Sequence, residues 1–517
     1  MALAVIHTRA TIGIDSPIVT IEAHISNGLP GLTLVGLPET TVKEARDRVR
    51  SALINSGFTY PPKRITVNLA PADLPKEGGR YDLPIAIAIL AASEQISTNK
   101  LHNYEFLGEL ALSGEIRRVT GAIPAALSAK KAERQLILSS ENQAELAILS
   151  QNETLLANHL LQVCHFLQGE QGKLGKQGEK VTLSSPPPVE PQTESFTLDI
   201  QDIIGQEQAK RALEITAAGG HNLLLLGPPG TGKTMLASRL CSLLPPLTHQ
   251  EALDVAAINS LSGHPINPQK WHTRPFRAPH HSASMAALVG GGSIPKPGEI
   301  SLAHNGVLFL DELPEFNRSV LDALREPLES GEIVISRAKA KVCFPAQVQL
   351  IAAMNPSPTG YHQGMHNRSS PHQVLRYLSK LSGPFLDRFD LSIEVPLLPP
   401  GILSQSSTKH GENSQEVKKR VAIARKIQIE RCGHINAHLS SKQTEDICKI
   451  SMENAVFLEN TLLKLGLSIR AWHRILRVSR TIADLKEQKS IEKPDIMEAL
   501  SYRSMDRLLI QLQKQAG

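Results

Sequence analysis

The stretch GPPGTGKT, residues 227–234, has the residue types and the spacing to hold a chain of phosphates. It fits the pattern G-x-x-x-x-G-K-[ST], in which glycines let backbone N–H groups point at phosphate oxygens. Lys233 is expected to face the β- and γ-phosphates, and the Thr234 hydroxyl to ligate Mg²⁺. A glycine-rich turn that binds nothing is the plain alternative, but the flanking apolar run and helical pattern favour phosphate binding. The expected nucleotide contacts are Gly227, Pro228, Pro229, Gly230, Thr231, Gly232, Lys233 and Thr234.

Three polar side chains follow two later apolar runs. Asp311 and Glu312 come directly after VLFL, and Asn355 comes after VQLIAAM. Because the carboxyl ends of parallel strands share one edge with the phosphate loop, these side chains are expected near the phosphates. Asp311 is expected to bind Mg²⁺ through water, and Glu312 to polarise a water for attack on the γ-phosphate. The Asn355 amide can hydrogen-bond that water or the phosphate, although an Asn before proline also suits a turn.

Strands and helices alternate around these residues. The apolar runs at 223–226, 307–310 and 348–354 are separated by helical patterns, which predicts a parallel sheet with helices on both faces. From residue 415 onward only helical periodicity is seen. We therefore expect an α/β core over residues 195–400 and a helical lid subdomain over residues 415–517.

The rest of the chain indicates a second domain before this core. Residues 169–194, GEQGKLGKQGEKVTLSSPPPVEPQTE, predict a flexible linker after an α/β domain of residues 1–168. The net charge of +5 is compatible with a nucleic-acid partner without establishing one. The five cysteines are scattered and have no C-x-x-C spacing, which is typical of a reducing compartment. With no leader pattern or membrane-length apolar run, a cytoplasmic protein is expected.

Five motifs occur in an order that resembles a known family. GPPGTGKT, FLDEL, AAMN, SGPFLDRFD and SIRAWHRIL together are similar to AAA+ ATPases of the branch that holds magnesium chelatase and the MCM helicases. RPFRAPHHSAS and NPSPTGYHQGMHNRSSP resemble the ComM/YifB family within it. The resemblance implies ATP and Mg²⁺ as cofactors and a homo-oligomeric ring, with a hexamer expected. It also matches Arg388 to an arginine finger that acts on a neighbouring subunit, and Arg470 to a second sensor arginine; a surface salt bridge is the ordinary alternative for each.

Two inserts in the core carry basic residues. EIVIS and KVCFPA alternate like the strands of a hairpin, with Arg337, Lys339 and Lys341 at its tip. The glycine- and proline-containing insert SMAALVGGGSIPKPGEIS interrupts a helix and places Lys296 near its own tip. The matching pre-sensor-1 hairpin of MCM-like ATPases grips the DNA backbone in a central pore, so the resemblance implies single-stranded and branched DNA as partners. A solvated hairpin tip is the alternative.

The first domain resembles a Lon-protease-like domain of the ribosomal S5 domain 2-like fold. The resemblance covers residues 63–92 and 106–127. Proteolysis would need a serine where Gly79 and Arg80 stand and a lysine where Pro124 stands, so a non-proteolytic domain is expected. Its basic residues could face nucleic acid or solvent; they are Arg46, Arg48, Arg50, Lys63 and Arg64.

The resemblance implies an ATP hydrolase coupled to DNA unwinding. The expected function is a helicase that promotes branch migration and the integration of incoming single-stranded DNA in natural transformation. Two alternatives stay open: a magnesium-chelatase-type subunit that drives metal insertion into a porphyrin, and an ATP-dependent protease-like chaperone. The adjacent His280 and His281 show no third ligand at the spacing of a metal site.

Overall fold

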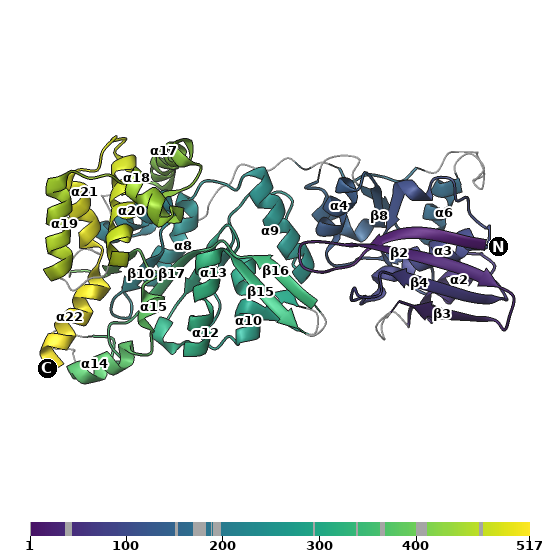
Figure 1. The fold of residues 1–517 in the computed structure, drawn as a ribbon, viewed down its shortest axis with the longest axis horizontal. Helices are drawn as coiled ribbons and strands as arrows, with labels where there is room; N and C mark the ends of the chain where they lie inside the picture. The colour runs from purple at the N-terminus through teal and green to yellow at the C-terminus, as the bar shows by residue number, and fades with distance from the viewer. Residues whose placement is uncertain are drawn as a thin grey trace.

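The computed structural model arranges the chain as an elongated molecule, with a mixed sheet at one end and a group of helices at the other (Figure 1). A parallel sheet with its helices lies between these two ends. The structure describes residues 2–36, 44–149, 154–168, 182–187, 189, 198–292, 295–337, 340–361, 368–399, 411–464 and 469–516. Within these ranges, no helix is long and apolar enough to cross a membrane.

The N-terminal sheet has seven strands in the order β3-β4-β2-β1-β5-β8-β9. The strands β1, β2 and β4 pair antiparallel, and the other pairs are parallel. Helix α3 is apolar on all sides, and every one of its residues is buried, as expected for a central helix. The principal elements are β1 (Ala2–Arg9), β2 (Ile18–Ser26), β3 (Gly31–Val35), α2 (Ala45–Asn55), β4 (Arg64–Ala70), the short helix η1 (Gly79–Tyr81), α3 (Asp82–Ala92), β5 (Tyr104–Phe106), β6 (Glu109–Leu110), β7 (Ile116–Arg117), α4 (Ala122–Lys131), β8 (Gln135–Ser139), α5 (Gln143–Leu146), β9 (Thr154–Ala157) and α6 (Leu160–Gln168).

The expected linker over residues 169–194 falls mostly outside the described residues. Residues 182–187 and 189 are described, and Ser184 forms a β-bridge with Leu156 of β9. The side chain of Leu183 is buried in the apolar core of the N-terminal domain. The described part of this segment therefore lies along the N-terminal domain.

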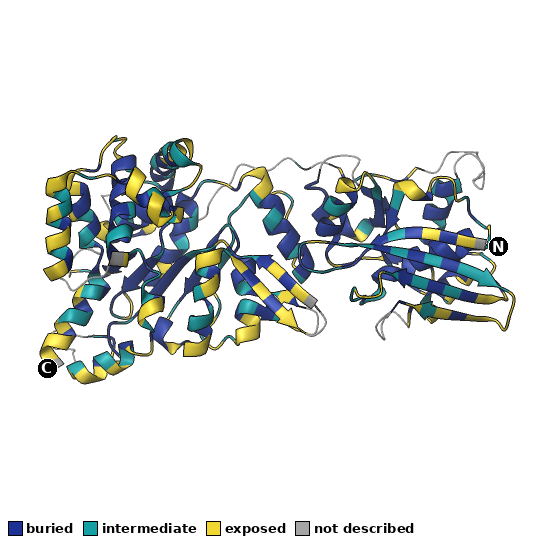
Figure 2. Cartoon of the chain, in the orientation of Figure 1, coloured by how far each residue is buried: buried dark blue, intermediate teal, exposed yellow. Residues whose placement is uncertain are grey.

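The central sheet has five strands, all parallel, in the order β11-β14-β17-β10-β18. Strands β10 and β14 are apolar at every position and fully buried, as sheets covered on both faces require. The strand labelled β10 in Figure 1 is accordingly dark blue in Figure 2. The parallel sheet predicted from the sequence is confirmed. Its elements are α7 (Glu207–Gly219), β10 (Leu223–Leu226), α8 (Lys233–Leu243), α9 (His249–Ser262), β11 (Phe276–Arg277), α10 (Met285–Val289), β12 (Gly290–Gly291), β13 (Lys296–Pro297), α11 (Glu299–Leu302), β14 (Val307–Leu310), α12 (Arg318–Ala323), α13 (Arg325–Ser330), β15 (Glu332–Arg337), β16 (Ala340–Pro345), β17 (Gln349–Met354), α14 (Pro371–Leu378), α15 (Gly383–Leu386) and β18 (Leu391–Glu394).

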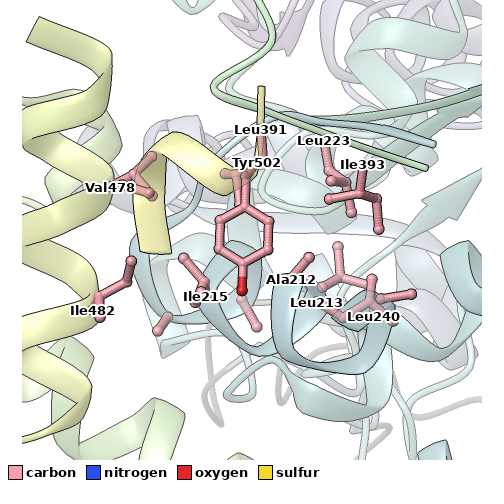
Figure 3. Packing of buried hydrophobic residues seen from close by; sticks show 14 of the residues in the cluster. Ala212, Leu213, Ile215, Leu223, Leu240, Leu391, Ile393, Val478, Ile482 and Tyr502 are labelled. Carbon is pink, nitrogen blue, oxygen red and sulfur yellow. The ribbon is translucent and has the colours of Figure 1, made fainter. Parts of the chain in front are cut away.

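The C-terminal part is helical, as its periodicity predicts. Its helices are α17 (Ser414–Cys432), α18 (Ser441–Ile447), α19 (Met452–Lys464), α20 (Ile469–Leu485), α21 (Lys493–Ser501) and α22 (Ser504–Ala516). Tyr502 is buried between the sheet residues Leu391 and Ile393 and the α20 residues Val478 and Ile482 (Figure 3). The last helix, α22, packs instead against α14 of the core (Figure 1). The helical part therefore contacts the core through Tyr502 and α22, and α17 also packs against α7 and α8.

Helix α9 joins the central part to the N-terminal domain. Its residues Ala256 and Ala257 are buried in one apolar cluster with Ile123 and Ala126 of α4. At the end of α9, Ser260 donates its hydroxyl to Glu145 at 2.8 Å and accepts from the Gly121 N–H at 2.9 Å. Apolar burial and hydrogen bonds therefore fix the N-terminal domain against this helix.

We expect Ala257→Glu to detach the N-terminal domain from the central part, because the substitution puts an unpaired carboxylate into the apolar contact between α9 and α4. The free energy of unfolding should fall by at least about 2 kcal/mol. Thermal denaturation should show the loss, and small-angle scattering should show a larger radius of gyration. The control is His264→Glu at the exposed position just after the end of α9, which should change neither quantity. An Ala257→Glu protein with the compactness and melting temperature of the parent would contradict this account of the interface.

Candidate functional site

The glycine-rich loop connects the buried strand β10 to helix α8. Gly230 and Gly232 have φ angles of +77° and +85°, a conformation that glycine adopts without strain. A Cβ atom added at either position would meet no other atom within 4 Å, so the loop is open on that side. At Gly227 a Cβ would collide with the Val395 carbonyl, which leaves room only for glycine. The loop therefore offers an open backbone cradle at the N-terminus of α8, where an anion is favoured.

Lys233 is the buried cation of this loop. Only 9% of the residue is exposed, and its ammonium donates to the carbonyls of Gly227 at 2.7 Å and Pro228 at 2.8 Å. It also donates to Asn355 Oδ1 at 3.2 Å, which brings the end of β17 to the loop. Burial lowers the pKa of Lys233, and the nearby Asp311 carboxylate opposes that shift. A phosphate in the cradle would give this ammonium the anionic partner that the loop carbonyls do not provide.

Thr234 and Asp311 form the second contact across the site. The Thr234 hydroxyl donates to Asp311 Oδ2 at 2.7 Å, and Asp311 Oδ1 accepts from the Glu312 N–H at 2.9 Å. A hydroxyl and a carboxylate oxygen at one point are hard oxygen donors of the kind that Mg²⁺ takes together with phosphate oxygens. The open cradle, the buried ammonium and this oxygen pair therefore fit a nucleoside triphosphate with Mg²⁺.

Glu312 occupies a strained backbone position beside this pair. Its φ angle is +52°, in the left-handed region that a glutamate rarely adopts. Its side chain is 58% exposed, and Oε2 lies 3.2 Å from Nδ1 of His281. From the sequence, His281 was weighed only as a metal ligand, with no third ligand at suitable spacing, and its contact with Glu312 was not predicted. No local pattern could have revealed it, because the two residues come from separate loops.

A large open cavity adjoins the exposed side of this site. Its volume is about 1090 Å³, and both Glu312 and Asn355 line it. The remaining charged side chains around it are mostly basic: Arg318, Arg368, Arg376 and Lys380, with the acidic Glu315. Glu312 and Asn355, the two residues that the sequence assigned to the attacking water, therefore both border one open space.

The structure places Arg388 and Arg470 away from the loop of their own chain. Both line a cavity of about 650 Å³ together with Asn222 and Asp390. Asn222 and Asp390 directly precede β10 and β18, whereas the phosphate loop follows β10. The two arginines therefore lie at the amino edge of the parallel sheet and the loop at its carboxyl edge. Within one chain they do not meet the phosphate site.

Arg388 is held in place by neighbours that the sequence analysis did not single out. It forms an ion pair with Glu329, and its side chain is 19% exposed. One turn beyond Arg470 on α20, the buried Arg474 donates to Asp387 Oδ1 at 2.7 Å and to the Phe389 carbonyl at 3.1 Å. Arg474 lies four residues after Arg470 and therefore on the same face of α20, and this spacing is the signal in the sequence that could have identified Arg474. Arg474 thus fixes the segment that carries Arg388 to the helical part.

The hairpin predicted between the core helices and β17 is present. Strands β15 and β16 pair antiparallel up to Arg337 and Ala340, and Arg337 and Lys341 are both exposed near its end. Lys339 lies outside the described residues. Lys296 is exposed on β13, which pairs with Gly291 of β12, and Arg337 Nη2 reaches the same glycine. Lys296 and Arg337 therefore lie close to each other.

The basic residues of the first domain do not form one uniform face. Arg48 makes two hydrogen bonds to the buried Asp82, at 2.7 and 3.1 Å, because it lies on the inner side of α2. Arg46 and Arg50 lie one turn apart on the other side, where Arg46 is near Asp47 and Arg50 lies over Tyr60. Of these helix residues, Arg48 is thus a structural ion pair.

Comparison with known proteins gives one consistent result over the whole chain. Residues 199–402 match the family described as "Magnesium chelatase, subunit ChlI", residues 21–142 match "Subunit ChlI of Mg-chelatase", and residues 411–503 match "Magnesium chelatase, subunit ChlI C-terminal". The chain is 61% identical over 516 residues to "Competence protein ComM" of Haemophilus influenzae, and 60% identical over 514 residues to "Uncharacterized protein YifB" of Escherichia coli; each alignment covers 99% of both chains. The "Magnesium-chelatase 38 kDa subunit" of Cereibacter sphaeroides is 27% identical over 37% of this chain and 57% of its own length.

We expect Glu312→Gln to bind ATP but to hydrolyse it about 10²–10⁴-fold more slowly, because the amide keeps the shape and loses the base. Phosphate release under saturating ATP measures the rate, and equilibrium binding of a fluorescent ATP analogue measures the affinity. The matched control is Glu315→Gln in the next turn, whose carboxylate faces Lys380 at the surface. Normal turnover by Glu312→Gln would mean that another residue orients the attacking water.

Proposed function

The chain belongs to the ComM/YifB family of magnesium-chelatase-like ATPases, and from this membership we propose that it is a ring-forming, ATP-driven DNA motor. The proposed motor is a helicase that promotes branch migration and helps incoming single-stranded DNA to integrate during natural transformation. The printed name of the relative in Haemophilus influenzae, a competence protein, supports this role. The observation that carries the proposal is the hairpin β15–β16 with its exposed basic end, which is joined by residues 346–348 to β17, the strand directly before Asn355.

ATP hydrolysis is the proposed driving reaction. The loop N–H groups and Lys233 hold the phosphates, and Thr234 and Asp311 hold the Mg²⁺ that accompanies them. Glu312 polarises the attacking water, and Asn355 orients it or the γ-phosphate. The contact of Glu312 with His281 keeps the carboxylate turned toward the exposed side of the site.

A ring is proposed because the chain separates its two catalytic faces. Arg388 and Arg470 lie at the sheet edge opposite the phosphate loop, so a neighbouring copy must present them to the nucleotide. A guanidinium supplied by a neighbour neutralises charge on the transferring phosphoryl group. Repetition of this head-to-tail contact closes a ring when the rotation fits, and a hexamer is the proposed number.

The hairpin is the proposed link between hydrolysis and DNA. Arg337, Lys341 and the neighbouring Lys296 are point charges that suit contact with the phosphate backbone whatever its sequence. Lys339 belongs to the same proposed set, although it lies outside the described residues. Since β17 connects the hairpin to Asn355, loss of the γ-phosphate at one end can shift the hairpin at the other.

The alternatives have weaker support. A magnesium-chelatase-type role in metal insertion is supported by the family descriptions and by a named chelatase subunit that is 27% identical over 37% of this chain, whereas the competence protein is 61% identical over 99% of it. A protease-like role lacks its nucleophile and base in the domain proposed over residues 1–168, where Gly79, Arg80 and Pro124 stand instead. We propose that the ATPase core of residues 195–400 and the lid of residues 415–517 perform the motor function, with 169–194 as the linker.

We expect Arg388→Ala to leave ATP binding by one subunit intact and to abolish hydrolysis in the assembled protein. A loss of at least about 10³-fold is expected for an arginine that acts in trans. The control is Arg507→Ala, an exposed arginine on α22. Mixing Arg388→Ala with Lys233→Ala subunits should restore part of the activity, since each contact can then combine one intact loop with one intact arginine. Normal hydrolysis by Arg388→Ala alone would overturn the trans arrangement.

We expect simultaneous neutralisation of Arg337, Lys339 and Lys341 to uncouple the motor: ATP is still hydrolysed, but DNA no longer stimulates hydrolysis and strands no longer separate. Each lost contact should lower the slope of log affinity against log salt by about 0.7 on single strands. Neutralisation of the three exposed lysines Lys442, Lys449 and Lys464 is the control. Normal DNA stimulation and unwinding by the hairpin variant, with ring formation verified by gel filtration, would contradict the DNA role of the hairpin.

A further inference from the structure

A second cavity lies where the N-terminal domain meets the central part, away from the phosphate loop. Its volume is about 560 Å³, within the range of pockets that bind small ligands. The N-terminal domain contributes residues around η1 and β6, and the central part contributes Leu261 of α9, the insert residues Pro295 to Pro297, and Phe344 of the hairpin. The cavity is therefore formed only when the two parts are docked.

The central feature of this cavity is Arg80. The residue is only 7% exposed, and its Nε and Nη2 atoms have no hydrogen-bond partner in the part of the chain that the structure describes. Among the described residues, no carboxylate forms an ion pair with it, and burial lowers its pKa. A buried guanidinium without a counter-charge carries a large desolvation cost, which native structures avoid unless the charge has a function.

Two further residues that line this cavity have unpaired hydroxyl groups. Tyr81, whose side chain is almost completely buried, and Thr11 find no hydrogen-bond partner for their hydroxyls among the described residues. Buried polar groups are rarely left unsatisfied, and here a cation and two hydroxyls belong to residues that line one cavity. A ligand with several oxygen acceptors and a negative charge satisfies all three.

The rest of the lining limits the ligand further. Lys296 and Arg118 add positive charge at the rim, and Arg118 is 3.7 Å from the buried Glu145. Glu77 and Glu109 also line the cavity, and the Glu109 carboxylate can accept hydrogen bonds from hydroxyl or amino groups of a ligand. Three prolines, with Leu261 and the almost fully buried Phe344, make up the apolar part of the lining. A cavity with cationic, acceptor and apolar lining suits a ligand that combines an anionic group, hydroxyl or amino groups and apolar surface, as a nucleotide does.

We propose that this cavity binds the phosphate of a nucleotide-sized ligand against Arg80, Tyr81 and Thr11. The ligand is either a free mononucleotide or the 5′-phosphorylated end of single-stranded DNA, which share this chemistry. Because Phe344 and Lys296 belong to the hairpin and the insert beside it, an occupied cavity stabilises these two elements against the N-terminal domain. The proposal does not depend on ATP hydrolysis.

Binding is measured by calorimetry and thermal shift on the full-length protein carrying Lys233→Ala, which weakens binding at the phosphate loop. The probes are inorganic phosphate, AMP, and oligothymidylate with and without a 5′-phosphate. We expect one saturable site per chain for AMP or for the 5′-phosphorylated oligonucleotide, with a rise in melting temperature. Preference for AMP identifies a free nucleotide, and preference for the 5′-phosphorylated strand over its 5′-hydroxyl counterpart identifies a DNA end.

Arg80→Met in the same background should weaken this binding by at least about tenfold, as expected for loss of a charge-assisted contact. The unliganded variant should melt at or above the temperature of its parent, because it removes an uncompensated buried charge. Thr11→Val, at a partly buried position, removes one hydroxyl of the site and leaves the charge of Arg80 in place. This variant should weaken binding about threefold or more. Unchanged affinity in both variants, or no saturable binding of any probe, would overturn the proposal.

Discussion

Two hydrogen bonds across the edge of the central sheet define the candidate site. Lys233 donates to Asn355, and Thr234 donates to Asp311, so the residues after β10, β17 and β14 meet at one point. Both contacts depend on the parallel pairing of these strands, in which Leu226 lies opposite Met354 and Leu310 opposite Ala352. A shift of one residue in either pairing would turn every side chain to the other face of its strand and separate the polar groups.

At the opposite edge of the sheet, the residues around Arg388 are held in position by contacts with the helical part. Arg474 of α20 holds Asp387 beside Arg388, and the buried His221 joins the same region to α20 through Thr481 at 2.8 Å. His221 also lies 3.5 Å from Asp390; burial would raise the pKa of Asp390, but this contact and the Asn222 N–H hold it below its ordinary value. Tyr502 packs between the sheet and α20 (Figure 3). Together with the Arg474–Asp387 contact, this packing joins the segment that carries Arg388 to the helix that carries Arg470. In the proposed ring, Arg388 and Arg470 of one subunit meet the nucleotide of the next. A change at that nucleotide would then be passed through the two arginines to the helical part that holds them.

The sequence alone predicted the elements that are determined by local pattern. The apolar runs of β10, β14 and β17 identify a buried parallel sheet, and the alternation in β15 and β16 identifies the hairpin. Contacts between distant loops could not be predicted: nothing near His281 indicates Glu312, and nothing near Ser260 indicates Glu145. The docking of α9 on α4 was missed because alanine-rich helix faces are typical of any packed interior. Arg80 was noticed only as a residue that replaces a nucleophile, since the lack of a partner is visible only in three dimensions.

The central claim is that the phosphate loop drives strand separation through the basic hairpin. Unwinding of a forked DNA duplex by the purified full-length protein, with ATP and with the unmodified chain beside Lys233→Ala, tests it most directly. The account predicts ATP-dependent strand separation by the unmodified chain and none by Lys233→Ala, because that variant lacks the charge that faces the β- and γ-phosphates. Equal unwinding by the two proteins, or DNA-independent ATP hydrolysis with no strand separation by the unmodified chain, would contradict it.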